Sequence, residues 1–306
     1  MKYLVTGGAG FIGSHICEGL LVAGHEVRVL DNLSSGYEKN VAGLDVDFVK
    51  ADVRDLEAVA AAAAGGDGIF HEAALVSVPE SVEKPLENDA INVTGTLNVL
   101  LAAREGGVRR VLLASSAAVY GNNPQLPKRE DMLPEPVSPY ALGKIAGEYY
   151  LRVFAELYGV QTVALRYFNV FGPRQDPGSM YSGVISKFVE VVKSGGTPTV
   201  FGDGEQTRDF VYVKDVVAAN LLAMTSERVG RGEVFNVGTG RRTSLLELIE
   251  TLAAIFGREV KPGFAAERAG DIRHSVSDIS RARDLLGYQP EATLEEGLRA
   301  LVAYST

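Results

Sequence analysis

The sequence predicts an α/β protein with a doubly wound parallel sheet, followed by a smaller α/β unit. Short apolar or β-branched runs alternate with longer helical patterns roughly every 20 to 35 residues through the first two-thirds of the chain. Several runs are apolar almost throughout, which is typical of strands covered by helices on both faces. A glycine-rich segment, "TGGAGFIGSH", joins the first run to the first helical pattern.

Six strands are expected in the first unit, each placed on one apolar run. They are Lys2–Thr6, Glu26–Leu30, Asp47–Lys50, Gly68–His71, Val111–Ser115 and Thr162–Tyr167. After Phe168, the proline- and glycine-rich segment "NVFGPRQDPGSMYSG" predicts a long loop and the start of a second unit.

The second part of the chain is expected to combine helices with short strands. The helices are Val184–Ser194, Val216–Thr225, Ser244–Phe256, Ser280–Leu286 and Leu294–Tyr304, and the strands are Thr199–Phe201, Phe210–Val213 and Val234–Val237. The sequence contains no repeat and no long linker, so we expect the two units to pack closely.

Composition limits the classes of function. The 306 residues, 46% hydrophobic and 23% charged, can bury one large core or two moderate ones. A net charge of −9 and a pI near 5.1 argue against nucleic-acid binding, which requires a basic surface. The single cysteine, Cys17, excludes an internal disulfide, and the four histidines have no metal-binding spacing, so no metal site is predicted.

No segment resembles a membrane span. The longest alanine-rich run is much shorter than the roughly 20 apolar residues that cross a bilayer. The chain begins with the strand-like "KYLVTGG" in place of a leader peptide. We therefore expect a cytoplasmic protein that does not bind membranes.

The glycine-rich segment is a candidate nucleotide-binding turn. Four glycines between positions 7 and 13 follow the first strand and open a helix, a pattern that lets a pyrophosphate approach the backbone at the helix N-terminus. Asp31 ends the second strand, 18 residues after Gly13, where a carboxylate accepts hydrogen bonds from an adenosine ribose and repels a 2′-phosphate. The sequence thus predicts a Rossmann unit that binds NAD rather than NADP, although Asp31 alone could be a turn or capping residue.

The segment "SPYALGK" is a candidate catalytic motif. Ser138 can cap a helix that Pro139 begins, which places Tyr140 and Lys144 one turn apart on one face. Ionising a phenol near pH 7 requires roughly 4 kcal/mol of preferential stabilisation, which an ammonium, an oxidised nicotinamide and desolvation could supply together. Ser116, at the end of a strand, could bond the reacting hydroxyl. Taken singly, Tyr140, Lys144 and Ser116 are better explained as helix packing, a solvated charge and a strand-end cap.

Together these motifs resemble the extended short-chain dehydrogenase/reductase family over nearly the whole chain. The chain is most similar to its NAD-dependent UDP-sugar 4-epimerases, the UDP-glucose / UDP-N-acetylglucosamine 4-epimerase group. The segments that carry the resemblance are "TGGAGFIG", "DNLSSG", "ADVRD", "HEAA", "SSAAVYG", "SPYALGK", "LRYFNVFGPRQDP", "TRDFVYVKDV", "FNVGTG" and "RAGDIRHSVSD".

The resemblance implies a reversible oxidation at C4 of the sugar. Tyr140 would take the proton of the 4-hydroxyl while C4 gives hydride to NAD, and the hydride would return to the other face of the 4-keto sugar. Lys144 would also hold the nicotinamide ribose, and Ser116 would contact O4. The implied cofactor-binding residues are Gly7, Gly10, Phe11, Ile12, Gly13, Asp31, Asn32, Ser35, Gly36, Asp52, Val53, Ala73, Ala74, Asn92, Tyr140, Lys144 and Tyr167.

The resemblance also implies a UDP-sugar site. Its residues would be Ser116 at the sugar, Asn169, Arg208 and Arg268 at the diphosphate, Val184 and Phe201 near the uracil, Asp271 at its ribose, and Ser275. Without the resemblance, each of the two arginines could equally form a surface ion pair. Ser275 replaces a tyrosine of epimerases limited to non-acetylated hexoses, so activity on UDP-GlcNAc/UDP-GalNAc is predicted, together with UDP-Glc/UDP-Gal.

Other members of the family remain alternatives. Ala117 and Ala118 stand where related dehydratases have Asp-Glu, so 4,6-dehydration and decarboxylation lack their acid/base group. Asn169 and Asp176 differ from the threonine and arginine of uronate 4-epimerases. Ala118 and Val76 also depart from hexose epimerases that have threonine and lysine there. Asp176 would repel the carboxylate of a uronate, and the intact Tyr140, Lys144 and Ser116 speak against a non-catalytic protein. A uronate 4-epimerase, another UDP-sugar-modifying member of the family and a non-catalytic NAD-binding regulatory protein stay open as alternatives.

The resemblance gives expected domain limits and an expected assembly. Residues 1–170 and 214–240 would bind NAD, and residues 171–213 and 241–306 would bind the nucleotide sugar. Helices expected near Glu87–Arg104 and Pro139–Tyr158 resemble the family's dimer-forming pair, so we expect a homodimer.

Overall fold

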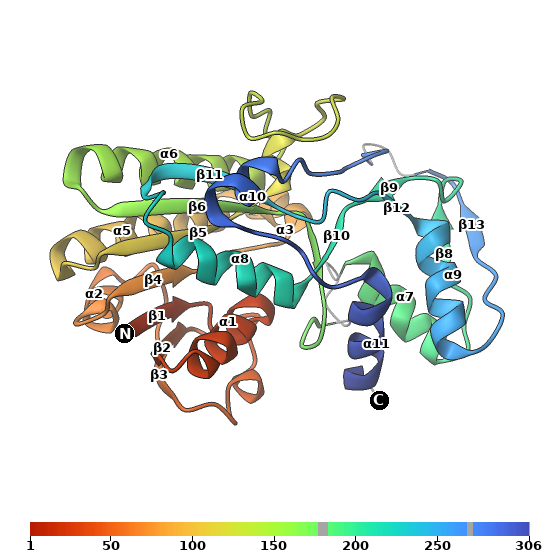
Figure 1. Ribbon diagram of the computed structural model, residues 1–306, viewed down its shortest axis with the longest axis horizontal. Helices are drawn as coiled ribbons and strands as arrows, with labels where there is room; N and C mark the ends of the chain where they lie inside the picture. Colours follow the sequence, from red (N-terminus) through yellow and green to blue (C-terminus); the bar gives the residue numbers. More distant parts are fainter. Residues whose placement is uncertain (177–182, 268–271, 306) are drawn as a thin grey trace.

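The computed structural model describes residues 1–176, 183–267 and 272–305 (Figure 1). Its main feature is a parallel sheet in the strand order β11-β6-β5-β4-β1-β2-β3. The strands are β1 (Lys2–Thr6), β2 (Glu26–Asp31), β3 (Val46–Lys50), β4 (Gly68–His71), β5 (Arg110–Ser116), β6 (Gln161–Tyr167) and β11 (Arg231–Val237). The order runs outward from β1 in both directions, so the doubly wound sheet predicted from the sequence is confirmed.

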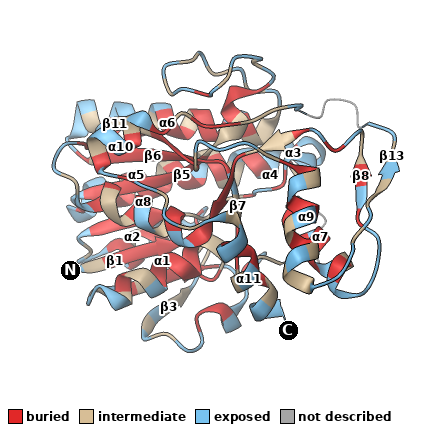
Figure 2. Ribbon diagram, turned by 45° about the vertical axis from the view of Figure 1, so that its right-hand side comes forward, coloured by how far each residue is buried: buried red, intermediate tan, exposed pale blue. Residues whose placement is uncertain are grey.

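Helices cover both faces of this sheet, as its apolar strands require. One face carries α1 (Phe11–Val22), α8 (Val213–Thr225) and α10 (Ser280–Leu286), and the other carries α2 (Leu56–Ala63), α5 (Gly95–Gly106) and α6 (Pro139–Tyr158). Neighbouring strand residues point to opposite faces, so Leu4 and Val5 of β1 belong to different cores. Buried residues accordingly run through the layered part of the molecule in Figure 2.

A third apolar core holds most of the remaining elements, which lie to the right of the sheet in Figure 1. The elements that contribute to this core are β7 (Asn169–Phe171), α7 (Val184–Lys193), β8 (Thr199–Phe201), β10 (Phe210–Tyr212), α9 (Leu245–Phe256) and α11 (Leu294–Ser305). The short strands β9 (Thr207–Arg208), β12 (Thr243–Ser244) and β13 (Gly263–Ala265) pair with their neighbours in the same part of the molecule. Phe171, Phe188 and Leu248 are among the residues that this core buries.

Short elements connect β4 and β5 to the helices that follow. Helices α3 (Val78–Glu83) and α4 (Pro85–Asp89) precede a π-helical turn, Ala90–Thr94, that runs directly into α5. A 3₁₀ turn, Ala117–Tyr120, follows β5. None of the helices in the described ranges is long and apolar enough to cross a membrane.

The expected elements agree with the structure to within a few residues, but four short strands were not expected. The segment after Phe168, expected to be a loop, begins with strand β7, which pairs in parallel with β10. Its hydrogen-bonding partner lies about 40 residues further along the chain, so no local signal marks it. Strands β9, β12 and β13 were missed for the same reason, because each is two or three residues long and exists through a distant partner.

Candidate active site

The glycine turn between β1 and α1 is as tight as its sequence suggested. Gly7 has a φ of +69°, and the Gly10 nitrogen donates to the Gly7 carbonyl at 3.0 Å. A Cβ atom at Gly13 would lie 2.2 Å from that same carbonyl oxygen, and one at Gly7 would lie 2.6 Å from the nitrogen of Ala73. No side chain caps α1 at Gly10, so Phe11 and the residues after it begin a helix whose N-terminus can receive an anion.

Asp31 lies beside this turn at the end of β2. Its buried carboxylate accepts hydrogen bonds from the backbone nitrogens of Ala9, at 3.0 Å, and Leu33, at 2.8 Å. Asp31 therefore holds the glycine turn and also stands at the position that contacts an adenosine ribose in dinucleotide-binding folds. The structural and the functional interpretations of Asp31 are compatible.

The loop after β2 folds back onto the glycine turn. Asn32 Nδ2 donates to Asp52 Oδ2 at 2.7 Å, and the Gly36 backbone is so close to Ala9 that a Cβ atom would lie 2.9 Å from the Ala9 carbonyl carbon. A hydrogen bond from Arg54 holds the pKa of Asp52 well below its usual range. The structure thus brings Asn32, Gly36 and Asp52 around the turn, with Ser35 exposed in the same loop and Val53 buried behind it.

The segment after β4 forms the other wall. Ala73 lies against Gly7, and Ala74 follows it. Asn92 fixes this segment, because its Oδ1 accepts from the Leu75 nitrogen at 2.8 Å and its Nδ2 donates to the Leu75 carbonyl at 3.0 Å. Asn92, which the sequence predicts to contact the cofactor, thus braces this wall through both ends of its amide.

The three candidate catalytic residues converge at the carboxyl end of β5. Ser138 caps α6 by accepting from the Ala141 nitrogen at 3.2 Å, so Tyr140 and Lys144 lie in its first two turns. Lys144 is buried, and its Nζ donates to the Ala114 carbonyl at 2.7 Å. Ser116, the last residue of β5, lies close enough to the partly exposed Tyr140 for its hydroxyl to lower the pKa of the phenol.

The charges around this cluster act in opposite directions. Burial lowers the pKa of Lys144 to about 8, and attraction to Glu72 opposes that change. Desolvation raises the pKa of Tyr140, the nearby Ser116 hydroxyl lowers it, and the Glu72 charge raises it further. In the protein alone, burial therefore outweighs the groups that favour the Tyr140 phenolate, so positive charge from a ligand is needed to lower its pKa.

Glu72 is a residue of this site that the sequence interpretation missed. It follows β4, and its carboxylate accepts a hydrogen bond from the Tyr167 hydroxyl at 2.9 Å, while Asn220 Nδ2 donates to the same hydroxyl at 2.8 Å. Burial raises the pKa of Glu72 to about 7. The sequence feature that could have identified Glu72 is the motif "HEAA", in which a carboxylate directly follows a buried strand.

The described substrate-site candidates lie on several separate elements around the third core. Asn169 begins β7, Val184 begins α7, Phe201 ends β8, Arg208 ends β9, and Ser275 follows the gap after residue 267. Thr207 connects two of them, because its carbonyl accepts from Arg208 Nη1 and from the Ser275 nitrogen, each at 3.0 Å. Arg268 and Asp271 lie outside the described residues.

A second missed residue, Asp209, organises this region. Its buried carboxylate accepts from the backbone nitrogens of Thr239 at 2.8 Å, Gly240 at 3.0 Å and Ser277 at 3.0 Å, and from two hydroxyls. Asp209 thereby joins the strand end that carries Arg208 to the segment that carries Ser275.

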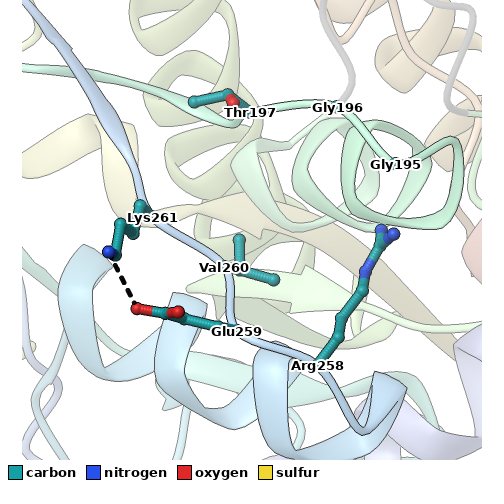
Figure 3. A pocket seen from close by; sticks show the side chains of 7 residues that line it. All are labelled: Gly195, Gly196, Thr197, Arg258, Glu259, Val260 and Lys261. Atoms are coloured by element: carbon teal, nitrogen blue, oxygen red, sulfur yellow. Dashed lines mark ion pairs between the residues drawn. The ribbon is translucent and has the colours of Figure 1, made fainter.

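A surface pocket of about 250 Å³ lies elsewhere on the molecule (Figure 3). It is lined by Gly195, Gly196 and Thr197, which follow α7, and by residues 258–261, which follow α9. Lys261 and Glu259 form an ion pair there at 3.1 Å. None of the candidate cofactor or substrate residues that the structure describes lines this pocket.

Comparison with known proteins agrees with this geometry. A curated UDP-glucose 4-epimerase from Mycolicibacterium smegmatis is 44% identical over 99% of this chain and 98% of its own length. A UDP-N-acetylglucosamine 4-epimerase from Methanobrevibacter ruminantium, solved with UDP-N-acetylmuramic acid, is 40% identical with a TM-score of 0.94 over 99% of this chain and 97% of its own. A Thermus thermophilus UDP-glucose 4-epimerase, solved with NAD, is 41% identical with a TM-score of 0.90 over 99% and 98%.

Residues 3–238 match the model of the NAD dependent epimerase/dehydratase family. This match covers the glycine turn, the Asp31 loop, Ser116 and the Tyr140–Lys144 motif. The resemblance inferred from the sequence motifs is confirmed, and the chain belongs to the NAD-dependent epimerase/dehydratase family.

Proposed function

We propose that this protein interconverts UDP-hexoses, and UDP-N-acetylhexosamines, at C4 with NAD as its cofactor. The observation that carries the proposal is the convergence of Tyr140, Lys144 and Ser116 at the end of β5, two strands from the glycine turn. Relatives named UDP-glucose 4-epimerase and UDP-N-acetylglucosamine 4-epimerase, similar over almost their full lengths, support the same reaction.

The residues present fit a dinucleotide. Glycines at 7, 10 and 13 let the backbone form a tight turn at the uncapped N-terminus of α1, where backbone nitrogens can bind a pyrophosphate, and Asp31 stands where it can accept from a ribose. When bound, NAD supplies the hydride acceptor and donor for C4. We assign residues 1–170 and 214–240 to this role, and residues 171–213 and 241–306 to the nucleotide sugar.

The mechanism follows from the charges of three side chains. Tyr140 removes the proton of the sugar 4-hydroxyl and returns it after the sugar has turned. Lys144 favours the phenolate by its positive charge, and Ser116 donates to or accepts from O4 beside the phenol. Because Lys144 Nζ now bonds to the Ala114 carbonyl, its other two protons are the ones free to meet a ribose hydroxyl.

The size of residue 275 supports a site that accepts N-acetylated sugars. Ser275 is partly buried, and its backbone is fixed by the Thr207 carbonyl, so its small side chain leaves space that a tyrosine would fill. A uronate is less favoured, because the Asp176 carboxylate, which accepts from the Tyr37 hydroxyl at 2.7 Å, would repel a second carboxylate nearby.

We further propose a cytoplasmic homodimer that forms through α6. The helix exposes an apolar stripe of Leu142, Tyr149, Val153 and Leu157, whose exposed fractions run from 43% to 67%, and α4 exposes Leu86 at 86%. An apolar stripe of this kind on a soluble enzyme is typical of an interface. Light scattering checks the assembly, and a monomer at micromolar concentration would contradict it.

One experiment tests the reaction. The purified protein is incubated separately with UDP-GlcNAc, UDP-Glc and UDP-GlcA without added NAD, and the C4 configuration is followed by proton NMR. We expect turnover of the first two, because each cycle regenerates the bound cofactor. The Tyr140→Phe variant should lose the activity by at least about 100-fold. Near wild-type turnover in that variant would overturn the mechanism.

A further inference from the structure

Three residues on one stripe of α6 each contact a different residue of the β5 end. Tyr140 lies near Ser116, whose hydroxyl lowers the pKa of the phenol. Lys144 donates to the Ala114 carbonyl at 2.7 Å, and Glu148 accepts from the Ser115 hydroxyl at 2.5 Å. The spacing of four residues puts all three side chains on the same face of the helix. Glu148 therefore continues the row formed by the two candidate catalytic residues.

Glu148 has a second partner on the neighbouring strand. Arg166 of β6 donates to it through two atoms, Nε to Oε1 at 2.9 Å and Nη2 to Oε2 at 2.7 Å. The two side chains are only 4% and 3% exposed. A forked pair of this kind fixes direction as well as distance, because both guanidinium nitrogens must face both carboxylate oxygens.

The opposite side of Arg166 is also enclosed. Its guanidinium carbon lies 4.8 Å from the centre of the Tyr120 ring, and the Tyr120 hydroxyl donates to Asn236 Oδ1 at 2.6 Å. Within the described part of the chain, no hydrogen-bond partner is found for its Nη1. The carboxylate is thus held from β5 and from β6, while the arginine is itself held between Glu148 and an aromatic ring.

Stability alone gives no reason for this arrangement. Burying two charges costs desolvation, and apolar side chains of similar volume often stabilise a fold equally well. The Glu148–Arg166 pair also restricts how far α6 can slide along its axis, or rotate about it, relative to the end of β5.

We propose that Glu148, clamped by Arg166 and Ser115, is a positioning residue that sets the placement of Tyr140 and Lys144 for the reaction. The inference rests on the proposed roles of those two residues. It predicts a selective effect on the chemical step, because a displacement of about 1 Å in a reacting group can lower a rate about 100-fold.

The test compares a charge-neutral variant with a matched control. Glu148→Gln keeps the shape but places an amide donor or a neutral oxygen against the guanidinium, and Glu148→Leu/Arg166→Met replaces the pair with apolar groups. The control is Arg110→Met, since Arg110 is also buried in β5 but bonds to the Ala223 and Met224 carbonyls at the other end of the strand.

We expect both Glu148 variants to remain folded with NAD bound, to lower kcat by about 10- to 100-fold, and to change KM less than twofold. The limb of the kcat–pH profile that reports the ionisation of Tyr140 should move to higher pH. The reason is that a displaced phenolate is stabilised less by the positive charge of Lys144. Arg110→Met should lower Tm and keep kcat and the pH profile at a temperature where it is folded.

Three results would overturn the inference. Wild-type kcat in either Glu148 variant, with Tyr140→Phe inactive, would remove the positioning role and leave the proposed reaction intact. An equal loss of kcat in Arg110→Met would show that the kcat loss of the Glu148 variants comes from general destabilisation. Full activity in Tyr140→Phe would remove the proposed catalytic roles and the positioning role with them.

Discussion

The Nζ atom of Lys144 lies 5.8 Å from the centre of the Tyr140 ring. At that distance the ammonium attracts a phenolate without bonding to it, and the interaction is strong only where water is largely excluded. Lys144 is buried and Tyr140 partly exposed, so a bound ligand would complete the exclusion of water. The protonation of Tyr140 should therefore depend on what occupies the site.

The pKa of Tyr140 should fall when NAD binds. In the protein alone, desolvation and Glu72 raise the pKa of Tyr140 above its usual value. The oxidised nicotinamide carries a positive charge, which stabilises the phenolate and lowers the pKa. Ultraviolet difference titration of phenolate, with Tyr140→Phe identifying the signal, should show ionisation at a lower pH in the NAD-loaded protein. An unchanged titration would contradict the expectation.

Gly7→Ala should abolish NAD binding. Its φ of +69° disfavours any side chain, and the new Cβ would lie 2.6 Å from the Ala73 nitrogen in the wall of the turn. Gly107 is the matched control, since its φ is +66° and a Cβ there would meet nothing within 4 Å. Gly107→Ala should lose about 1 kcal/mol of stability and keep NAD. Calorimetric titration distinguishes the two, and equal NAD affinity in both variants would be the contrary result.

Glu72→Gln should make the stability less dependent on pH. Burial raises the pKa of Glu72 from 4.5 to about 7 in the folded protein. The protonated acid therefore contributes stability that is fully present below pH 4.5 and is lost as the pH rises through 7. The variant has no such loss. Between pH 4.5 and 8, the difference between its free energy of unfolding and that of the wild type should therefore shift in favour of the variant by up to about 3 kcal/mol. Urea unfolding at the two pH values measures it.

Ser275→Tyr should narrow the choice of sugar. A tyrosine would fill the space left by the serine, so turnover of UDP-GlcNAc should fall by at least about 10-fold while turnover of UDP-Glc is kept within a few-fold. Ser275→Ala is the control and should leave both activities unchanged. Proton NMR of the two substrates gives the ratio. Unchanged turnover of UDP-GlcNAc in Ser275→Tyr would place residue 275 outside the sugar site.

The sequence by itself determined the parallel sheet, the glycine turn and the order of the catalytic motif. Apolar runs give strand positions, because a strand covered on both faces must be apolar throughout. The spacing from Ser138 to Lys144 gives the helix start and the shared face, because the period of a helix is fixed. These features depend on residues close together in the chain, so they were predicted to within a few residues.

Only the tertiary structure decided how those parts meet. The Glu72–Tyr167 bond joins residues 95 positions apart, and the Glu148–Arg166 pair joins α6 to a strand whose place beside β5 comes from the sheet order. The same is true of Asp209, whose partners follow it by 30 to 68 positions. Residue spacing cannot show such contacts, since the pairing of strands and the burial that shifts each pKa arise only when distant segments pack together.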